Sequence, residues 1–479
     1  MWDDTRNMTY LKCDKTNNLS NTSQYENPII EVIDIKESKN KQFILQWEII
    51  FLKDRKGWLG NLLFHYSKKN KEDIWQKSAS FLYDNESITF LKQNVNLCVN
   101  IKTKNIAVKV TLICVCLDKV KTEMIIRINH GLKMHNIHLQ DKKCEFQMLD
   151  ACNNGIKIKF PKKIYFNEIY KLELIYSGIP ILRRPSYWEK GRLILSEESM
   201  ILPCLNLFPR NWYQIELNLK TKFRTNILGC GEKIENGKWI SKEKTSGLCL
   251  IAGNYNIAEY SFKICHTYFY YTQEFKMRLE EAKKEIEKSI LYFTTLFGIF
   301  PYDVINIVCD KDAPICFINS NTIVLNHIDI IALSHEMVHI WWGGCIKGNG
   351  PDWKLFHEGF AELFSDIYIF QKNKSGTIED IAERYIKLKK TDVNVEYNKI
   401  TISCEVTQQE INSYKIYVMK IMEKVGVKTF LKRCRYIVQK YCFGNIDVDN
   451  VWHILKNGKE LKSSFEDATG IYNYNPKEN

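Results

Sequence analysis

The pattern of hydrophobic and polar positions changes near residue 258 of the 479-residue chain. Before that point, short runs of β-branched and aromatic residues are separated by clusters of Asn, Asp, Lys and Gly, a pattern typical of strands and turns. These runs predict an all-β domain or a pair of sheets. They lie at Ile29–Ile35, Phe43–Phe51, Asn96–Val115, Met124–Ile128, Gly155–Phe160, Tyr170–Tyr176 and Tyr213–Leu219.

After Tyr260 the apolar positions recur with a helical period. Those between Gln273 and Leu296 fall on one face of a helix, which Gly298 and Pro301 would end. The rest of the chain alternates between two short strands and a series of helices. The strands are predicted at Val304–Cys309 and Thr322–Leu325, and the helices at Ile328–Trp342, Phe356–Phe370, Ile378–Lys389, Ser413–Val425 and Lys428–Lys440.

Together these patterns predict an α+β protein with three parts. Residues 1–27, rich in Asn, Thr and Ser, form a polar lead-in. Residues 28–258 form a β-rich N-terminal domain, and residues 259–479 form a mainly helical domain. The boundary depends only on the change of pattern, because no internal repeat or low-complexity linker marks it.

Composition and charge indicate a folded protein without a nucleic-acid or membrane partner. The hydrophobic fraction of 45% supplies enough apolar side chains for sizeable cores. The net charge of +12 could suit nucleic acid, but the lysines are scattered along the chain and form no long basic run. The best apolar run, Ile106–Leu117, is too short for a bilayer span and is interrupted by Lys109.

The cysteines and the N-terminus predict a cytoplasmic location. The chain has 16 cysteines but no C-x-x-C pair, so paired-cysteine metal sites are not expected. Cys309 and Cys316 lie in apolar stretches, where a reduced thiol behaves as a small hydrophobic side chain. The segment Met1–Lys12 lacks the apolar core of a secretory signal. A reducing compartment follows from this cysteine usage.

Candidate metal ligands and a candidate catalytic base lie together in the segment His335-Glu336-Met337-Val338-His339. On a helix, positions i and i+4 lie on one face, so both imidazoles can bind one ion. Imidazole and carboxylate suit Zn²⁺, which keeps one of four positions open in catalytic sites. Glu336 follows the first ligand directly and can take a proton from the attacking water. The spacing therefore predicts one zinc ion, with Glu336 as the catalytic base.

A third ligand is available in Glu358, which lies 19 positions after His339 in another predicted helix. Two antiparallel helices could bring this carboxylate opposite the histidines. Glu362, one turn further on, could hydrogen-bond a ligand imidazole and fix its tautomer. The alternative is that these glutamates are surface charges and the histidines are hydrogen-bonded core residues. The combined spacing favours the metal site.

These segments resemble a known family. The run from His335 to Gly343 resembles the signature of the aminopeptidase N-like zinc metallopeptidases, which are gluzincins. Trp353–Leu363 resembles that family's W-x-x-E-G-F-A segment around its third zinc ligand, and Gly298–Tyr302 resembles the sequence that leads into its catalytic sheet. The resemblance implies a thermolysin-like catalytic domain preceded by a saddle-like β domain. It also implies hydrolysis of N-terminal peptide bonds.

The region just before the zinc-binding helix departs from the family. The family has a G-A-M-E-N segment there, whose glutamate binds the free amino group of the substrate. The corresponding run, Cys316–Asn321, contains no acid, so strict aminopeptidase specificity loses its main physical cause. We expect Asn319 and Ser320 to contact the substrate, and Thr322–Leu325 to pair with an extended peptide.

The oxyanion-stabilising tyrosine of the family is also displaced. Alignment at Gly426 and Phe430 places Ile411 at its position, and Tyr414 lies about one helical turn further on. Tyr414 is our candidate for stabilising the negative charge of the tetrahedral intermediate. The alternative is an ordinary aromatic residue on a helix face.

The end of the chain gives a third departure. Val451–Gly470 resembles the last helices of the family's catalytic domain, and no large C-terminal helical domain is expected after it. Either the cleft is more open than in the family, or another subunit covers it in an oligomer. Three further histidines, His266, His327 and His357, are interpreted as structural residues.

The leading function is therefore a zinc-dependent metallopeptidase of the aminopeptidase type. One alternative is an endopeptidase, or a dedicated peptide-processing protease, that lacks the amine-binding glutamate. Another is a catalytically weak zinc-containing binding module, and a third is a hydrolase of a non-peptide ester or epoxide. Glu336 favours hydrolysis, because a structural zinc site needs no base beside an open position.

Overall fold

The computed structural model describes residues 87–458 except 150–154, 183–184, 190, 206–210, 222–225, 350–352, 373 and 390–407, and the backbone of five strands before residue 87. The described residues divide into two compact units. Unit 1 contains the residues up to Asn256 together with Asp312–Ile315. Unit 2 contains Ile257–Lys311 and the described residues from Cys316 onwards.

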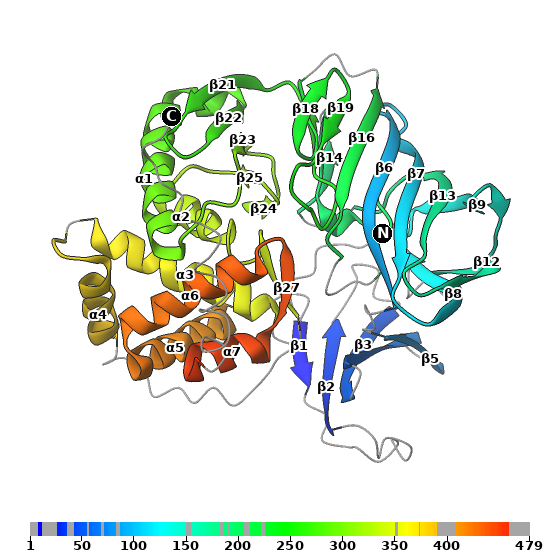
Figure 1. Ribbon diagram of the computed structural model, residues 1–479, viewed down its shortest axis with the longest axis horizontal. Helices are drawn as coiled ribbons and strands as arrows, with labels where there is room; N and C mark the ends of the chain where they lie inside the picture. Colours follow the sequence, from blue (N-terminus) through cyan, green and yellow to red (C-terminus); the bar gives the residue numbers. More distant parts are fainter. Residues whose placement is uncertain are drawn as a thin grey trace. The chain divides into compact units, whose positions relative to one another are not determined.

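The N-terminal strands of unit 1 form an antiparallel sheet in sequence order, β1-β2-β3-β4-β5 (Figure 1). One of them, β1, lies within the polar lead-in predicted for residues 1–27, because Thr9 and Tyr10 are strand formers that pair with β2. The strands are β1 (Met8–Leu11), β2 (Glu26–Ile35), β3 (Phe43–Asp54), β4 (Gly57–Lys68) and β5 (Lys71–Leu82).

The largest sheet of unit 1 has the order β10-β9-β13-β7-β6-β16-β19-β18. Along β7 the side chains of Ile106, Val108, Val110 and Leu112 are all buried, so one face of the strand packs in the core. Each such side chain contributes about 1.5–3 kcal/mol. The strands are β6 (Ile88–Asn100), β7 (Asn105–Cys116), β9 (Leu132–Leu139), β10 (Lys142–Lys143), β13 (Ile169–Gly178), β16 (Gln214–Thr221), β18 (Glu232–Glu235) and β19 (Lys238–Ile240).

Two smaller sheets complete unit 1, with the orders β11-β12-β8 and β14-β15-β20-β17. A short 3₁₀ helix, η1 (Glu197–Ser199), follows β15. The strands are β8 (Val120–Arg127), β11 (Glu145–Met148), β12 (Gly155–Tyr165), β14 (Tyr187–Glu189), β15 (Arg192–Leu195), β17 (Asn226–Leu228) and β20 (Leu250–Gly253).

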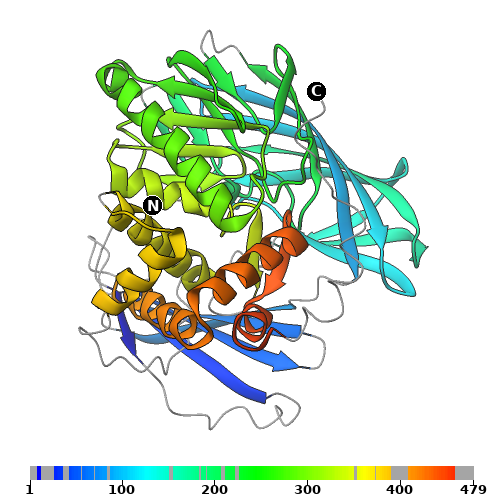
Figure 2. The same cartoon turned by 60° about the vertical axis from the view of Figure 1, so that its left-hand side comes forward.

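Unit 2 contains a five-stranded sheet with the order β21-β22-β23-β25-β24. Strands β22, β23 and β25 run parallel, and β24 pairs with β25 as an antiparallel edge hairpin. Helix α1 lies beside this sheet in both views (Figures 1 and 2). The strands are β21 (Asn256–Ser261), β22 (His266–Tyr271), β23 (Val304–Cys309), β24 (Phe317–Asn319) and β25 (Thr322–Leu325).

The remainder of unit 2 is mainly helical. Helices α2, α3 and α5 pack in succession against one another, and α6 and α7 pack beside α5 (Figure 1). A short parallel pair, β26 and β27, joins the segment after α2 to the segment after α6. The elements are η2 (Gln273–Arg278), α1 (Leu279–Phe297), α2 (Ile330–His339), β26 (Ile346–Asn349), α3 (Trp353–Gln371), α4 (Ile378–Lys389), α5 (Gln408–Val425), α6 (Val427–Tyr441), β27 (Gly444–Asp447) and α7 (Val448–Asn457).

An aromatic cluster forms the core beneath α2 and α3. Phe297 of α1 contacts the rings of Trp341, Trp342 and Phe364, with centroid separations between 4.9 and 5.7 Å. The indole Nε1–H of Trp341 also donates a hydrogen bond to the carbonyl of Ile299 at 2.6 Å. These contacts hold the segment that follows α2 against α1.

The predicted division into strands followed by helices is observed, so the α+β class is confirmed. None of the helices that the structure describes is both long and apolar enough to cross a bilayer.

Candidate metal centre

Helix α2 presents two histidines one turn apart. Its N-terminus is capped by Asp329, whose Oδ1 accepts a hydrogen bond from the Ala332 N–H at 2.8 Å. Met337 and Val338 are fully buried and fix the orientation of the helix. His335 and His339 therefore project together, and their Nε2 atoms lie 3.1 Å apart.

Helix α3 supplies the third group of this centre. Glu358 Oε2 lies 3.3 Å from Nε2 of His335 and 3.5 Å from Nε2 of His339. For a tetrahedral zinc ion with bonds near 2.05 Å, ligand atoms are expected about 3.3 Å apart. The three atoms therefore form a triangle of the size that zinc requires, and they are the one such group found among the described residues.

Hydrogen bonding fixes the tautomer of His339. Its Nδ1 lies 2.9 Å from the carbonyl oxygen of Trp342, which can only accept, so the proton is on Nδ1. The lone pair of Nε2 is then directed into the triangle. Gly343 lies against this ring with φ of 111°, and a Cβ there would come within 3.4 Å of Nδ1. A glycine is therefore required at this position.

Glu336 is a buried carboxylate beside the triangle, with 7% of its surface exposed. Burial raises the pKa of Glu336, although His339 and His335 oppose this effect. A carboxyl group with a raised pKa is suited to accepting a proton and returning it near neutral pH. Glu336 interacts electrostatically with both histidines and with Glu358, and its role as the base remains a prediction.

His339 and Glu358 strongly affect each other's pKa. Burial lowers the pKa of His339, but the Glu358 carboxylate outweighs it and raises the pKa to about 9. Burial also acts to raise the pKa of Glu358, but His339 and His335 hold it well below its usual range. A bound cation would replace the proton that this group otherwise retains.

Glu362 follows Glu358 by one turn of α3. Its Oε1 accepts a hydrogen bond from Nε2 of Gln408 at 3.2 Å. Within the described parts of the chain, no hydrogen bond joins Glu362 to His335 or His339. Its predicted role in orienting a ligand imidazole remains a prediction.

Tyr414 lies on α5 directly against α3. Its side chain is fully buried, and its ring contacts Trp452 with centroids 5.4 Å apart. A Cβ added to Gly359 would meet Tyr414 Cδ1 at 2.5 Å, so the ring packs on the backbone next to Glu358. This position brings Tyr414 near the ligand helix, and its catalytic role remains a prediction.

Asn319 and Ser320 lie at the tip of the β24–β25 hairpin. Asn319 is buried and pairs with Thr322, and Ser320 occupies the two-residue turn with φ of 51°. Their contact with substrate remains a prediction. The expectation that Thr322–Leu325 pairs with an extended peptide is wrong, because β25 lies between β23 and β24 and both of its sides are paired. The edge strands of this sheet are β21 and β24, and β24 is the one in the hairpin.

His357 has the structural role that was predicted for it. Its ring is buried, and its Nε2 accepts a hydrogen bond from the Gly348 N–H at 2.9 Å, which joins α3 to β26. His266 is hydrogen-bonded through Nδ1 to the Ser261 hydroxyl at 3.0 Å. His327, by contrast, lies beside Cys316, an arrangement that sequence reasoning missed because the two residues are 11 positions apart.

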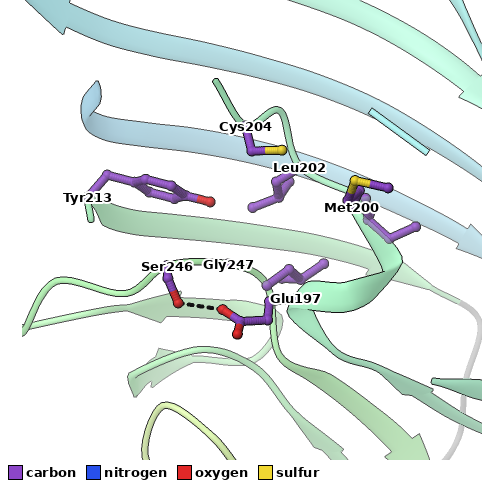
Figure 3. Close-up of a pocket in the computed structure, with 9 residues that line it drawn as sticks. Glu197, Met200, Leu202, Cys204, Tyr213, Ser246 and Gly247 are labelled. Atoms are coloured by element: carbon purple, nitrogen blue, oxygen red, sulfur yellow. Dashed lines mark hydrogen bonds between the residues drawn. The ribbon is translucent and has the colours of Figure 1, made fainter. Parts of the chain in front are cut away.

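A separate small pocket lies within unit 1 (Figure 3). Its walls are mostly apolar, and the hydroxyl of Ser246 donates a hydrogen bond to the Glu197 carboxylate. Its free volume of about 10 Å³ admits roughly one water molecule. This pocket is therefore too small to bind a peptide.

Solved structures with the same fold include zinc metallopeptidases and a hydrolase. An M1 zinc metallopeptidase from Deinococcus radiodurans matches with a TM-score of 0.64 and 13% identity, over 80% of this chain and 95% of that chain. A mutant of it bound to a Tyr-Ser-Ala substrate matches with a TM-score of 0.64 and 13% identity, over 79% of this chain and 93% of that chain. Native yeast LTA4 hydrolase matches with a TM-score of 0.59 and 14% identity, over 80% of this chain and 66% of that chain.

Sequence comparison adds no closer relative: no protein-family model and no curated protein matches the chain. At identities of 13–14% the structural likeness establishes the fold. The chain therefore has the fold of the M1 zinc metallopeptidases, in agreement with the resemblance of its motifs.

Proposed function

We propose that the protein is a zinc-dependent metallopeptidase, with His335, His339 and Glu358 as zinc ligands and Glu336 as the general base. The observation that carries the proposal is the triangle of ligand atoms, 3.1–3.5 Å on each side, with a buried carboxylate beside it. A purely structural zinc site would have four protein ligands and no need of this carboxylate.

Each site residue has its own role in the proposed reaction. Zinc, when bound, supplies a Lewis acid that polarises the substrate carbonyl and makes a water molecule more acidic. Glu336 accepts the proton of the attacking water and delivers it to the leaving amine. The hydrogen bond from His339 Nδ1 to Trp342 keeps Nε2 available as a ligand throughout. Tyr414, packed beside the ligand helix, is the proposed donor to the oxyanion.

We propose peptides as the substrate class and aminopeptidase-type cleavage as the first choice. One structure with this fold was determined with a Tyr-Ser-Ala substrate. The edge strand β24 can pair with an extended peptide backbone. Cleavage of internal bonds is the alternative, because the Asn319–Ser320 tip offers no carboxylate to pair with a free amino group.

Mass spectrometry of a peptide pool tests this proposal. Each peptide would be present in free and N-acetylated form, with a chelator-treated control. Removal of single N-terminal residues from free peptides alone is expected for an aminopeptidase. Internal cuts in both forms would establish the endopeptidase alternative. Absence of chelator-sensitive cleavage across the pool would contradict the proposed function.

A zinc-containing binding module is the second candidate, favoured by the missing amine-binding acid. Substitution Glu336→Gln separates the two candidates, because the amide keeps the shape of the side chain but cannot accept the proton. We expect full zinc content with at least about a thousandfold loss of hydrolysis. Glu287→Gln, a change at an exposed glutamate of α1, is the matched control and should keep the activity. Unchanged turnover in Glu336→Gln would exclude this carboxylate as the base.

The free thiols accord with a reducing compartment. The cysteines in the described residues are unpaired with one another by disulfide bonds, and most of them are buried. We therefore keep a cytoplasmic location as part of the proposal.

A further inference from the structure

Two cysteines that are far apart in the sequence come together where β26 and β27 begin. Cys345 directly precedes β26, and Cys442 lies just before β27. The two strands run parallel with Ile346 paired to Gly444, and the Phe443 N–H donates a hydrogen bond to the Cys345 carbonyl at 2.6 Å. The two thiols are also hydrogen-bonded to each other. Strand pairing in unit 2 therefore holds the two sulfur atoms side by side.

Backbone hydrogen bonds fix the segments that carry both sulfurs. The Cys345 N–H donates to the Ile340 carbonyl at 3.0 Å, which ties it to the end of α2. The Cys442 N–H donates to the Val438 carbonyl at 3.1 Å, which ties it to the last turn of α6. A disulfide bond forms readily only where the fold already brings two cysteines together, and this position meets that condition.

The two thiols differ in exposure and in acidity. Cys345 is fully buried and Cys442 is half-buried, so a solvent-borne oxidant reaches Cys442 first. Burial, together with the hydrogen bond and the charge of Cys442, holds the pKa of the Cys345 thiol well above its ordinary value. Cys345 therefore keeps its proton after Cys442 has ionised. Because the thiolate is the nucleophilic form, Cys442 reacts first and Cys345 completes the bond.

We propose that Cys345 and Cys442 are an oxidisable pair that closes into a reversible disulfide bond between β26 and β27, with hydrogen peroxide as the oxidant. The Cys442 thiolate takes one peroxide oxygen and becomes a sulfenic acid, and the other oxygen leaves as hydroxide, which solvent protonates to water. The Cys345 sulfur then bonds to the sulfenic sulfur, and its proton leaves with the hydroxyl group as a second water. Two electrons pass from the sulfurs to the peroxide, and a thiol reductant restores both thiols.

The bond joins two segments of unit 2 next to the zinc ligands. On β26 the Gly348 N–H donates to the ring of His357, which directly precedes Glu358. A disulfide at the start of β26 therefore restrains the strand that supports the third ligand. In a reducing compartment the pair stays as thiols, and the bond forms only when peroxide is present. The inference depends on the paired thiols alone and stands whether or not the metal centre hydrolyses peptides.

Peptide mapping of the peroxide-treated, zinc-loaded full-length protein tests the proposal. After alkylation and tryptic digestion, we expect peptides 312–347 and 441–456 to be joined, with a mass two hydrogen atoms below their sum, and to separate after dithiothreitol. Peptide 312–347 also contains Cys316, so Cys316→Ser should keep the link and Cys345→Ala should lose it. Cys442→Ser changes a half-buried side chain and should fold as the wild type does, which a melting curve under reducing conditions verifies.

The melting temperature gives a second readout. Because the bond closes a long loop, oxidation should raise the melting temperature of the wild type by roughly 5–15 °C and leave that of Cys442→Ser unchanged. Cys98→Ser removes an exposed thiol elsewhere and should respond to peroxide as the wild type does. The proposal is overturned if the linked peptides are absent, if Cys345→Ala retains the link, or if the oxidised and reduced wild type melt at the same temperature.

Discussion

At the scale of single residues, the three histidines near the centre have different tasks. His335 and His339 each supply one corner of the triangle, so His335→Ala or His339→Ala should leave less than about a tenth of the zinc bound after dialysis. His357→Gln should retain zinc, because the His357 ring supports the Gly348 backbone and is not one of the three grouped ligands. Metal analysis of the purified variants checks this. Stoichiometric zinc in His339→Ala would contradict the ligand assignment.

Tyr414 gives a second prediction at this scale. Tyr414→Phe keeps the ring that packs against Gly359 and Trp452 and removes only the hydroxyl. If that hydroxyl stabilises the oxyanion, kcat should fall by about 10²- to 10³-fold with little change in stability. Steady-state kinetics and a melting curve measure the two effects. An unchanged kcat would assign Tyr414 to packing alone.

At the scale of elements, tyrosine–carboxylate hydrogen bonds join the helices of unit 2. Tyr368 of α3 donates to Glu285 of α1, and Tyr385 of α4 donates to Asp366 of α3, both at 2.6 Å. Burial, together with these carboxylates, raises the pKa of both tyrosines above the ordinary value of 10. Above pH 10 the unfolded chain therefore loses phenolic protons that the folded chain keeps.

The sign of the pH effect follows directly. Below pH 10 the two hydroxyl groups contribute fully to the free energy of unfolding. Above pH 10 the free energy of unfolding should fall by at most about 1.4 kcal/mol per pH unit for each tyrosine. Tyr385→Phe should make this alkaline decline shallower. Tyr165→Phe, a change at an exposed tyrosine, should not. Urea unfolding between pH 8 and 11 measures the slopes, and equal slopes in wild type and Tyr385→Phe would refute the prediction.

The observed bounds of helices and strands also show which sequence patterns were enough to predict them. The bounds predicted for β23, β25 and α4 are the observed ones, because each has a clear apolar period between turn residues. The predicted strand Asn96–Val115 is in fact two strands, since a turn at 101–104 interrupts its continuous β-formers. The predicted helix Ile328–Trp342 ends at His339, because the chain turns before Gly343 to accommodate the His339 hydrogen bond.

At the scale of the whole molecule, the sequence best predicted which site residues come together when those residues are close along the chain. His335 and His339 are four residues apart on one helix, so their convergence follows from helical geometry. Glu358 required the resemblance of its segment as well as its distance along the chain. The Cys316–His327 pair has no local period, because strand pairing brings the two residues together, and only the structure reveals it.

Zinc should stabilise the two units unequally, since ligand binding stabilises only the part that forms the site. All three ligands lie in unit 2, and among the described residues of unit 1 no group of metal-binding side chains is close enough to hold an ion. At a free zinc concentration a thousandfold above Kd, unit 2 gains about 4 kcal/mol. Chelation should therefore accelerate amide hydrogen exchange in α2 and α3 and leave β6 and β7 unchanged.

Hydrogen exchange followed by mass spectrometry makes this measurement. In His335→Ala, α2 and α3 should exchange quickly with or without chelator, because the site is already lost. Equal acceleration in both units would show that zinc stabilises the chain as one cooperative whole. Protection of α2 and α3 that is indifferent to chelator would instead mean that packing of the aromatic core beneath them, rather than the metal, holds the two ligand helices together.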